Sequence, residues 1–186
     1  MSGLPVALLD PLRRFRPTED AHFIKCEPDE LPEELRSLLV HQGDMTSKLE
    51  KYHSSKITLE VLQSGRGDAG HYYREVLLRS AHSGEAVEYG AIEIFLEALP
   101  GPVQREIIQG KIPLGGLLNS HGVHYCSRPQ AFFSVHEEPC LCELLCSPLA
   151  AELYGRCNIL CTEEGVVLAR ILEVLPPVSK LKTSLL

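Results

Sequence analysis

Residues 72–79 read YYREVLLR, and this stretch decides the fold. It is rich in the aromatic and β-branched or leucine side chains that pack well on a pleated surface. Gly84 marks a turn after it, and residues 87–96, VEYGAIEIFL, supply a second run of the same character. Two such runs joined by a short glycine-containing link predict a β-hairpin. We therefore expect an antiparallel sheet at the centre of the protein.

The pattern continues in both directions from this hairpin. Further strands are expected at residues 57–62, 132–135, 157–161 and 166–175, the last two as a closing hairpin. Helices are expected at residues 31–52 with a break at 41–44, and at 103–109, 113–118 and 140–153. The sequence thus predicts an α+β fold with an antiparallel five- to six-stranded sheet and helices inserted between its strands.

Composition and length indicate an ordinary globular protein of 186 residues, 44% of them apolar and 23% charged. A chain of this size can bury one core, so we expect a single domain at residues 29–177. Residues 1–28, with four prolines, are expected to form an irregular leader, and residues 178–186 a loose tail. The 18 basic and 25 acidic side chains give a net charge of −7, which disfavours a nucleic-acid partner.

The sequence also argues against membrane and export signals. There is no apolar run of about 18 residues to span a bilayer, and the N-terminus lacks the basic start of a secretory signal. Seven cysteines without an export signal favour reduced thiols, so we expect a cytoplasmic protein without a membrane partner. The cysteines at 140–161 contain no Cys-x-x-Cys pair, which favours burial over a metal site.

Arg74 is the first candidate functional residue. Side chains two apart on a strand share a face, so Arg74 lies with Tyr72, Val76 and Leu78 on the side expected to face the core. Glu75 is expected to face solvent on the other side. A buried guanidinium stays charged and costs several kcal/mol, in order of magnitude, unless an anion meets it. The pattern therefore predicts a negative group opposite Arg74.

Glu173 is the second candidate, because it is the only charged side chain among Val167, Ala169, Ile171 and Leu175 on one face of its strand. Isolation in apolar surroundings would raise its pKa and make it a proton donor or acceptor near neutral pH. Two interpretations are equally open: Arg74 and Glu173 form a functional site, or they simply pair with each other.

Four segments resemble, in order, the motifs of the chorismate pyruvate-lyase family. Residues 44–50, DMTSKLE, resemble its Ser-Met-Thr-x-x-hydrophobic-Glu segment, and residues 73–78, YREVLL, its Leu-Arg-Glu-hydrophobic-Leu-Leu strand. Residues 113–118, PLGGLL, resemble its Pro-Leu-Gly turn. Glu173 stands four residues before Pro177, as the final glutamate of the family stands before its proline.

The resemblance implies a fold with a small internal pocket and a carbon–oxygen lyase that needs no cofactor. Such an enzyme eliminates pyruvate from chorismate to give 4-hydroxybenzoate, as in ubiquinone biosynthesis. Carried over by position, Arg74 would bind the ring carboxylate, and Met45 and Leu114 would contact the substrate. Glu173 would manage the departing oxygen and its proton. The protein would need only to hold the ring, exclude water and move one proton.

Two other functions are open from the sequence. The same fold type is similar to the effector-binding domain of some bacterial repressors, in which a carboxylate ligand would meet Arg74 without catalysis. The presence of Glu173 as well as Arg74 favours the enzyme, because an anion sensor needs only the cation. No helix-turn-helix pattern precedes residue 44, which disfavours a complete repressor. The third possibility is a scaffold that has lost activity; the oligomeric state and the downstream pathway are not predicted.

Overall fold

The computed structural model describes residues 3–67 and 70–183. The strands are β1 (Phe23–Cys26), β2 (Ile57–Arg66), β3 (Tyr72–Ser80), β4 (Ala86–Ile94), β5 (Cys126–Val135), β6 (Leu153–Cys161) and β7 (Val167–Leu175). The α-helices are α1 (Asp10–Arg13), α2 (Glu33–Leu39), α3 (Met45–His53), α4 (Gly101–Gln109), α5 (Leu114–Ser120), α6 (Pro139–Leu144) and α7 (Val178–Thr183). Short 3₁₀ turns lie at Val6–Leu8, Asp20–His22 and Leu96–Ala98. None of the helices within this described part is long and apolar enough to cross a membrane.

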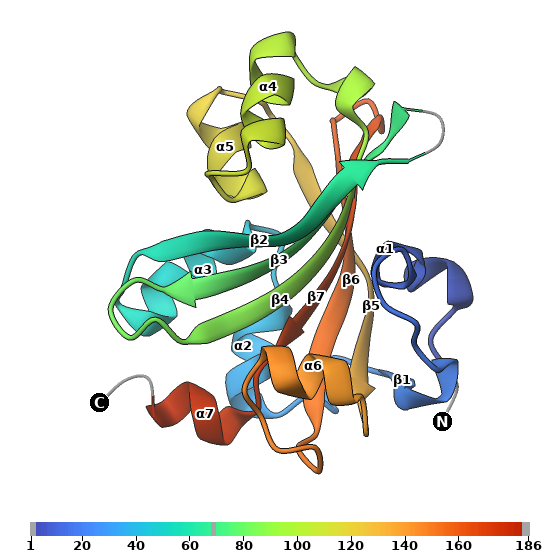
Figure 1. The fold of residues 1–186 in the computed structure, drawn as a ribbon, viewed down its shortest axis with the longest axis vertical. Coiled ribbons are helices and arrows are strands. Elements are labelled where there is room, and N and C mark those ends of the chain that lie inside the picture. Colours follow the sequence, from blue (N-terminus) through green and yellow to red (C-terminus); the bar gives the residue numbers. More distant parts are fainter. Residues whose placement is uncertain (1–2, 68–69, 184–186) are drawn as a thin grey trace.

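The described strands form one antiparallel seven-stranded sheet in the order β1-β5-β6-β7-β4-β3-β2 (Figure 1). The predicted α+β class and antiparallel sheet are confirmed, with more strands than the expected five or six. The hairpin of β3 and β4 pairs Arg74 with Ile92 and Leu78 with Glu88. The closing hairpin of β6 and β7 joins it through β4, which pairs with β7. The two hairpins therefore lie side by side at the centre of the sheet.

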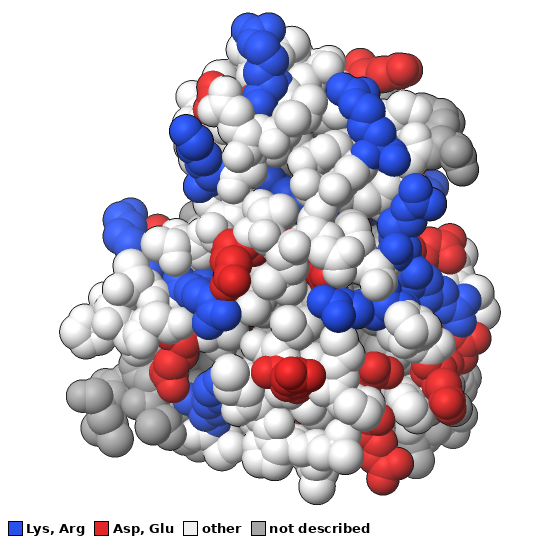
Figure 2. Space-filling view, viewed as in Figure 1, with Lys and Arg blue, Asp and Glu red and all other residues white. Residues whose placement is uncertain are grey.

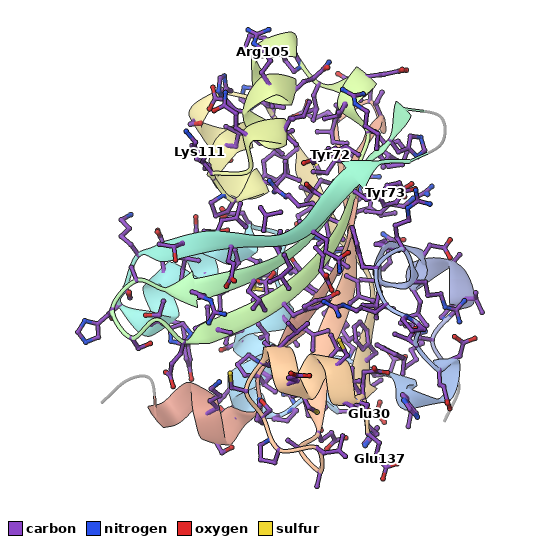
Figure 3. The ribbon with its side chains drawn as sticks, in the orientation of Figure 1. Glu30, Tyr72, Tyr73, Arg105, Lys111 and Glu137 are labelled. Atoms are coloured by element: carbon purple, nitrogen blue, oxygen red, sulfur yellow. The ribbon has the colours of Figure 1, made fainter. Side chains whose placement is uncertain are left out.

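Helices cover both faces of this sheet. Helices α2 to α5 pack on one face, and α1 and α6 pack on the other (Figure 1). Tyr72 and Tyr73 show the alternation directly (Figure 3): Tyr72 packs with the apolar cluster under α4 and α5, whereas Tyr73 lies on the opposite side, beneath Arg14. Since both faces are covered there, β3, β4, β6 and β7 have almost no exposed positions, whereas most residues of the edge strand β2 are exposed.

Glu75 shows the main error in the sequence-based assignment of faces. It was expected in solvent, but its side chain is fully buried on the α1 face. Its carboxylate accepts hydrogen bonds from Arg16 Nε at 2.8 Å and from the Tyr89 hydroxyl at 2.8 Å. The N-terminal segment carries Arg16 over this face. A sequence pattern on β3 alone does not reveal that cover.

Both ends of the chain are more ordered than the sequence predicts. The expected irregular leader at 1–28 contributes β1, which pairs with β5, and buries Leu9 and Leu12 against the sheet. The expected tail includes α7, while residues 184–186 lie outside the described residues. The expected boundary at residue 29 therefore separates segments that share one sheet.

The segment at 140–153 also differs from the predicted single helix. Helix α6 ends at Leu144, and Cys146 has a φ of +50°, which no helix continues. Pro148 follows and cannot donate a helical hydrogen bond. Strand β6 then begins at Leu153, four residues before the predicted start at 157. This earlier start places Arg156 inside the sheet.

Strand β6 is tightly packed at Gly155, which leaves no room for a side chain. A Cβ atom there would collide with the backbone carbonyl oxygen of Glu173 and would lie 2.6 Å from Cζ of Phe133. We expect Gly155→Ala to lower the free energy of unfolding by about 1–3 kcal/mol, the usual cost of overpacking. Urea denaturation measures this change. Gly65→Ala is the matched control, because a Cβ there meets no atom within 4 Å; equal losses for both variants would contradict the packing described.

Candidate functional site

A pocket opens on the face of the sheet covered by α2 to α5. We call it the central pocket, and the residues that line it include Met45, Arg74, Glu88, Leu114, Arg156 and Glu173. The four residues that the sequence singled out are all in this set, although they come from two strands and two helices. The hollow has a volume of about 50 Å³. One buried water needs only about 10–15 Å³, so the pocket has room for a larger group.

The floor of the central pocket is set by strand register. Arg74 on β3 lies opposite Ile92 on β4, which lies opposite Ile171 on β7. Two residues further along the strands, Gly90 of β4 lies opposite Glu173, which in turn lies opposite Arg156. Side chains two residues apart share one face, so these rows point into the same hollow.

The walls come from the first turns of α3 and α5. Asp44 caps α3 by accepting a hydrogen bond from the Ser47 backbone N–H at 2.7 Å. A Cβ on Gly115 would lie 2.7 Å from Cβ of Asp44, so glycine allows the two helix starts to meet. Met45 and Leu114, the first residues of the two helices, are thereby held at the pocket.

Arg74 has no partner in this pocket. Its side chain is fully buried, and its Nε, Nη1 and Nη2 atoms form no hydrogen bond. Burial lowers the pKa of Arg74 to about 10, which still leaves the guanidinium charged at neutral pH. The negative group that the sequence predicts opposite Arg74 is therefore not a side chain of the described protein.

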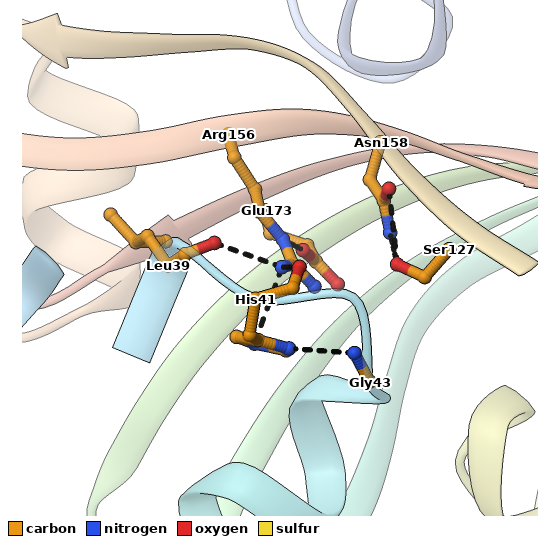
Figure 4. A network of polar contacts seen from close by, with 7 residues as sticks. All are labelled: Leu39, His41, Gly43, Ser127, Arg156, Asn158 and Glu173. Atoms are coloured by element: carbon orange, nitrogen blue, oxygen red, sulfur yellow. Dashed lines mark hydrogen bonds and ion pairs between the residues drawn. The ribbon is translucent and has the colours of Figure 1, made fainter. Parts of the chain in front are cut away.

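Glu173 pairs with Arg156, not with Arg74 (Figure 4). Nε of Arg156 donates to the Glu173 carboxylate, and its Nη1 donates to the backbone oxygens of Leu39 at 2.9 Å and His41 at 3.2 Å. Both side chains of the pair are almost completely buried. The predicted isolation of Glu173 on an apolar face is therefore wrong, and so is the alternative that it pairs with Arg74.

Arg156 is the residue that sequence reasoning missed. The predicted start of this strand at residue 157 leaves Tyr154 and Arg156 outside it, so their alternation with Asn158 gives no signal. A strand that begins at residue 153 places Arg156 directly opposite Glu173 in the closing hairpin. Asn158 lies next along the same face, where its amide nitrogen donates a hydrogen bond to the Ser127 hydroxyl at 2.9 Å (Figure 4).

Glu88 is the second carboxyl group of the pocket. Its side chain is 4% exposed and its Oε2 atom has no hydrogen-bond partner. Burial, and then the nearby charge of Glu173, raise the pKa of Glu88 well above its ordinary value. This direction favours the uncharged carboxylic acid, a form that can donate as well as accept a hydrogen bond.

The buried charges of the central pocket do not cancel. Arg156 and Glu173 neutralise each other, the raised pKa of Glu88 favours its uncharged form, and Arg74 contributes one positive charge without a hydrogen-bond partner among the described residues. Asp44 at the rim is already engaged by Ser47. In a low-dielectric site an uncompensated charge attracts a counter-ion far more strongly than in water. The arrangement can therefore bind one monoanionic group at Arg74.

His41, which contacts Arg156 of the pocket, makes the free energy of unfolding depend on pH in the acid range. Burial and the positive charge of Arg156 lower the pKa of His41 to about 4, from an ordinary value of about 6.5. Between these values the unfolded chain binds a proton that the folded protein does not, so the free energy of unfolding falls as pH drops from about 6.5 to 4. Urea midpoints measured across this range should decline, and less steeply in His41→Asn. An equal slope in both proteins would exclude His41 as the cause.

Comparison with known proteins finds solved structures of similar fold. No protein-family model matches the chain, and neither does any curated protein. PhnF from Mycobacterium smegmatis has a TM-score of 0.55 and 12% identity, covering 74% of this chain and 65% of that one. The effector domain of PhnF has the same score and identity, covering 72% of this chain and 88% of the domain. The ligand-binding domain of a GntR-family regulator from Bordetella bronchiseptica has a TM-score of 0.49 and 16% identity, covering 64% and 85%.

These comparisons correct the prediction of an enzyme. The solved structures with a TM-score of 0.55 are PhnF and its effector domain, not a lyase. The physical reason lies in the pocket: Glu173, expected to be an isolated acid–base group, is ion-paired with Arg156. The prediction of a chorismate pyruvate-lyase is therefore wrong. At 12% identity the likeness shows the fold, and this chain is similar in fold to an effector domain.

Proposed function

We propose that this chain is a non-catalytic module that binds a small aromatic carboxylate in the central pocket. One observation carries the proposal: the fully buried guanidinium of Arg74 has no hydrogen-bond partner among residues 3–67 and 70–183. An unpaired buried charge costs several kcal/mol, in order of magnitude. Binding of an anion removes this cost, so Arg74 would favour anionic ligands over neutral ones.

The chemistry of the pocket favours a carboxylate on an apolar body. A guanidinium presents a planar fork that matches a carboxylate with two parallel hydrogen bonds. Around it the floor and walls are mainly apolar, with Val76, Ile92, Leu160 and Ile171 from the sheet. Such surroundings stabilise a ring or hydrocarbon group and would not compensate a second charge.

The other predicted site residues take supporting roles in this proposal. Met45 and Leu114, at the two helix starts, would contact the body of the ligand. Glu173 would fix Arg156 and shape the middle of the floor, rather than move a proton. A ligand whose body exceeds the hollow would have to displace these helix starts, so the proposal favours compact acids.

Calorimetric titration with benzoate and its uncharged isostere benzamide tests the proposal. We expect benzoate to bind and benzamide to bind at least about tenfold more weakly, because charge-assisted hydrogen bonds are worth more than neutral ones. Equal affinities, or binding of neither, would contradict an anion site at Arg74. Release of pyruvate from chorismate would contradict a non-catalytic module.

The absence of a nucleic-acid partner is a prediction for this chain. The chain spans 65% of the PhnF structure that it matches. On the face shown in Figure 2, acidic side chains lie among the basic ones, and the net charge of the chain is −7. These features support the prediction that this domain itself does not hold nucleic acid, although the similar structures come from transcriptional regulators. The cytoplasmic location is likewise a prediction.

A further inference from the structure

The central pocket contains a second buried polar group without a partner. Oε2 of Glu88 is shielded from solvent and forms no hydrogen bond, and the side chain is 4% exposed. Leaving a buried acceptor unsatisfied costs about 1–3 kcal/mol. The proposed anion contact at Arg74 does not use Glu88, so this cost has no explanation within the site described so far.

Strand register places Glu88 and Arg74 at two ends of the floor. Arg74 lies opposite Ile92 of β4, and Glu88 lies four residues earlier on the same strand. Four residues span about 13 Å of strand. Gly90 occupies the middle of β4 without a side chain, and both polar residues line the same hollow. Nothing larger than a hydrogen atom therefore projects from β4 between the two ends.

No described residue beside Glu88 forms a hydrogen bond with its Oε2 atom. Leu78 stands opposite Glu88 on β3, and Gly90 follows on the same face of β4. Nε and Nη1 of Arg156 are engaged by Glu173, Leu39 and His41. A donor or acceptor for Oε2 must then come from the occupant of the pocket.

We infer that Glu88 binds an uncharged hydroxyl or carbonyl group at the end of the ligand opposite its carboxylate. This inference rests on the proposed anion site at Arg74 and narrows its ligand class to acids with two polar ends. A second anionic group is disfavoured because Glu173 lies beside this end of the pocket. The ligand class is thus a monoanionic acid with an apolar centre and a neutral hydrogen-bonding tip.

A matched pair of probes tests this assignment: 4-hydroxybenzoate and 4-methylbenzoate, which differ at the tip by a hydroxyl against a methyl group of similar size. Their affinities are measured by calorimetry for the wild-type protein, Glu88→Gln and Glu88→Leu. The wild type should prefer the hydroxy acid about tenfold, the value of one well-made hydrogen bond. Glu88→Gln, which keeps a donor and an acceptor, should retain the preference. Glu88→Leu should lose it and still bind the methyl acid.

The outcomes separate the two proposals. Suppose that both acids bind the wild type and that Glu88→Leu shows the same preference for the hydroxy acid as the wild type. This result would overturn the role of Glu88 and leave the Arg74 site intact. Equal binding of the two acids to the wild type would overturn it as well. If neither acid binds the wild type, the anion site is overturned and this inference with it. Thermal unfolding of each variant verifies that a lost preference does not reflect a lost fold.

Discussion

Arg74→Met is expected to abolish carboxylate binding and, at the same time, to stabilise the ligand-free protein. Methionine keeps much of the stem and removes a charge that no group in the described protein compensates. Loss of a buried charged contact weakens binding by about a hundredfold or more. Relief of the buried charge should raise the free energy of unfolding by about 2 kcal/mol, which for a chain of this size is about 4–8 °C in Tm. Benzoate titration and thermal unfolding measure the two effects.

Arg170→Met is the matched control for this experiment. Arg170 is on β7, but its side chain is half exposed and pairs with Glu93 outside the central pocket. The buried Glu93 carboxylate also contacts His71 and accepts a hydrogen bond from the Tyr73 hydroxyl, so Arg170→Met does not leave it without a partner. This variant should bind benzoate normally and gain no stability. A destabilised Arg74→Met that still binds benzoate would show that Arg74 is a structural residue.

Arg156→Met is expected to have the opposite effect on stability. It leaves the Glu173 carboxylate buried without a cation and close to the carboxyl of Glu88. Removing one partner of a buried ion pair costs about 3–5 kcal/mol, a large share of the stability of an ordinary domain. It also frees the backbone oxygens of Leu39 and His41 that Arg156 holds. Urea denaturation should show a sharply lowered midpoint.

The double variant Arg156→Met with Glu173→Leu tests the cause of that loss. Replacing both members of a buried pair by apolar side chains is often neutral, so most of the stability should return. The two single changes should therefore be strongly non-additive. If the double variant loses as much as the sum of the singles, the ion pair is not what Arg156 contributes.

The fold class was predictable because its central strands carry strong local signals. The runs at 72–79 and 87–96 are long, dense in strand-forming residues and separated by a short turn. The ends of the sheet carry weaker signals. Strand β1 has four residues and lies in a proline-containing segment, and its pairing with β5 is a contact between distant parts of the chain. Propensity does not report such contacts.

The site was predictable to the extent that one strand shows a charge among apolar neighbours. Arg74 on β3 meets this condition, and its burial follows from it. Glu88 on β4 does not meet this condition. Both faces of β4 are buried, and its two glutamates, at 88 and 93, lie on opposite faces, so the sequence pattern does not distinguish a polar face from an apolar one. Arg156 was missed with the start of β6. Which residue lies opposite Glu173 depends on how β6 and β7 pair, and the pattern along β7 alone does not show that this residue is Arg156.

The crystal structure of the protein with 4-bromobenzoate tests the central claim most directly. Anomalous scattering from bromine locates the probe independently of the protein density. We predict that its carboxylate lies within hydrogen-bond distance of the Arg74 guanidinium, with the ring between the first turns of α3 and α5 and the sheet. A probe bound elsewhere, or an Arg74 side chain paired with a protein group in that crystal, would contradict the account.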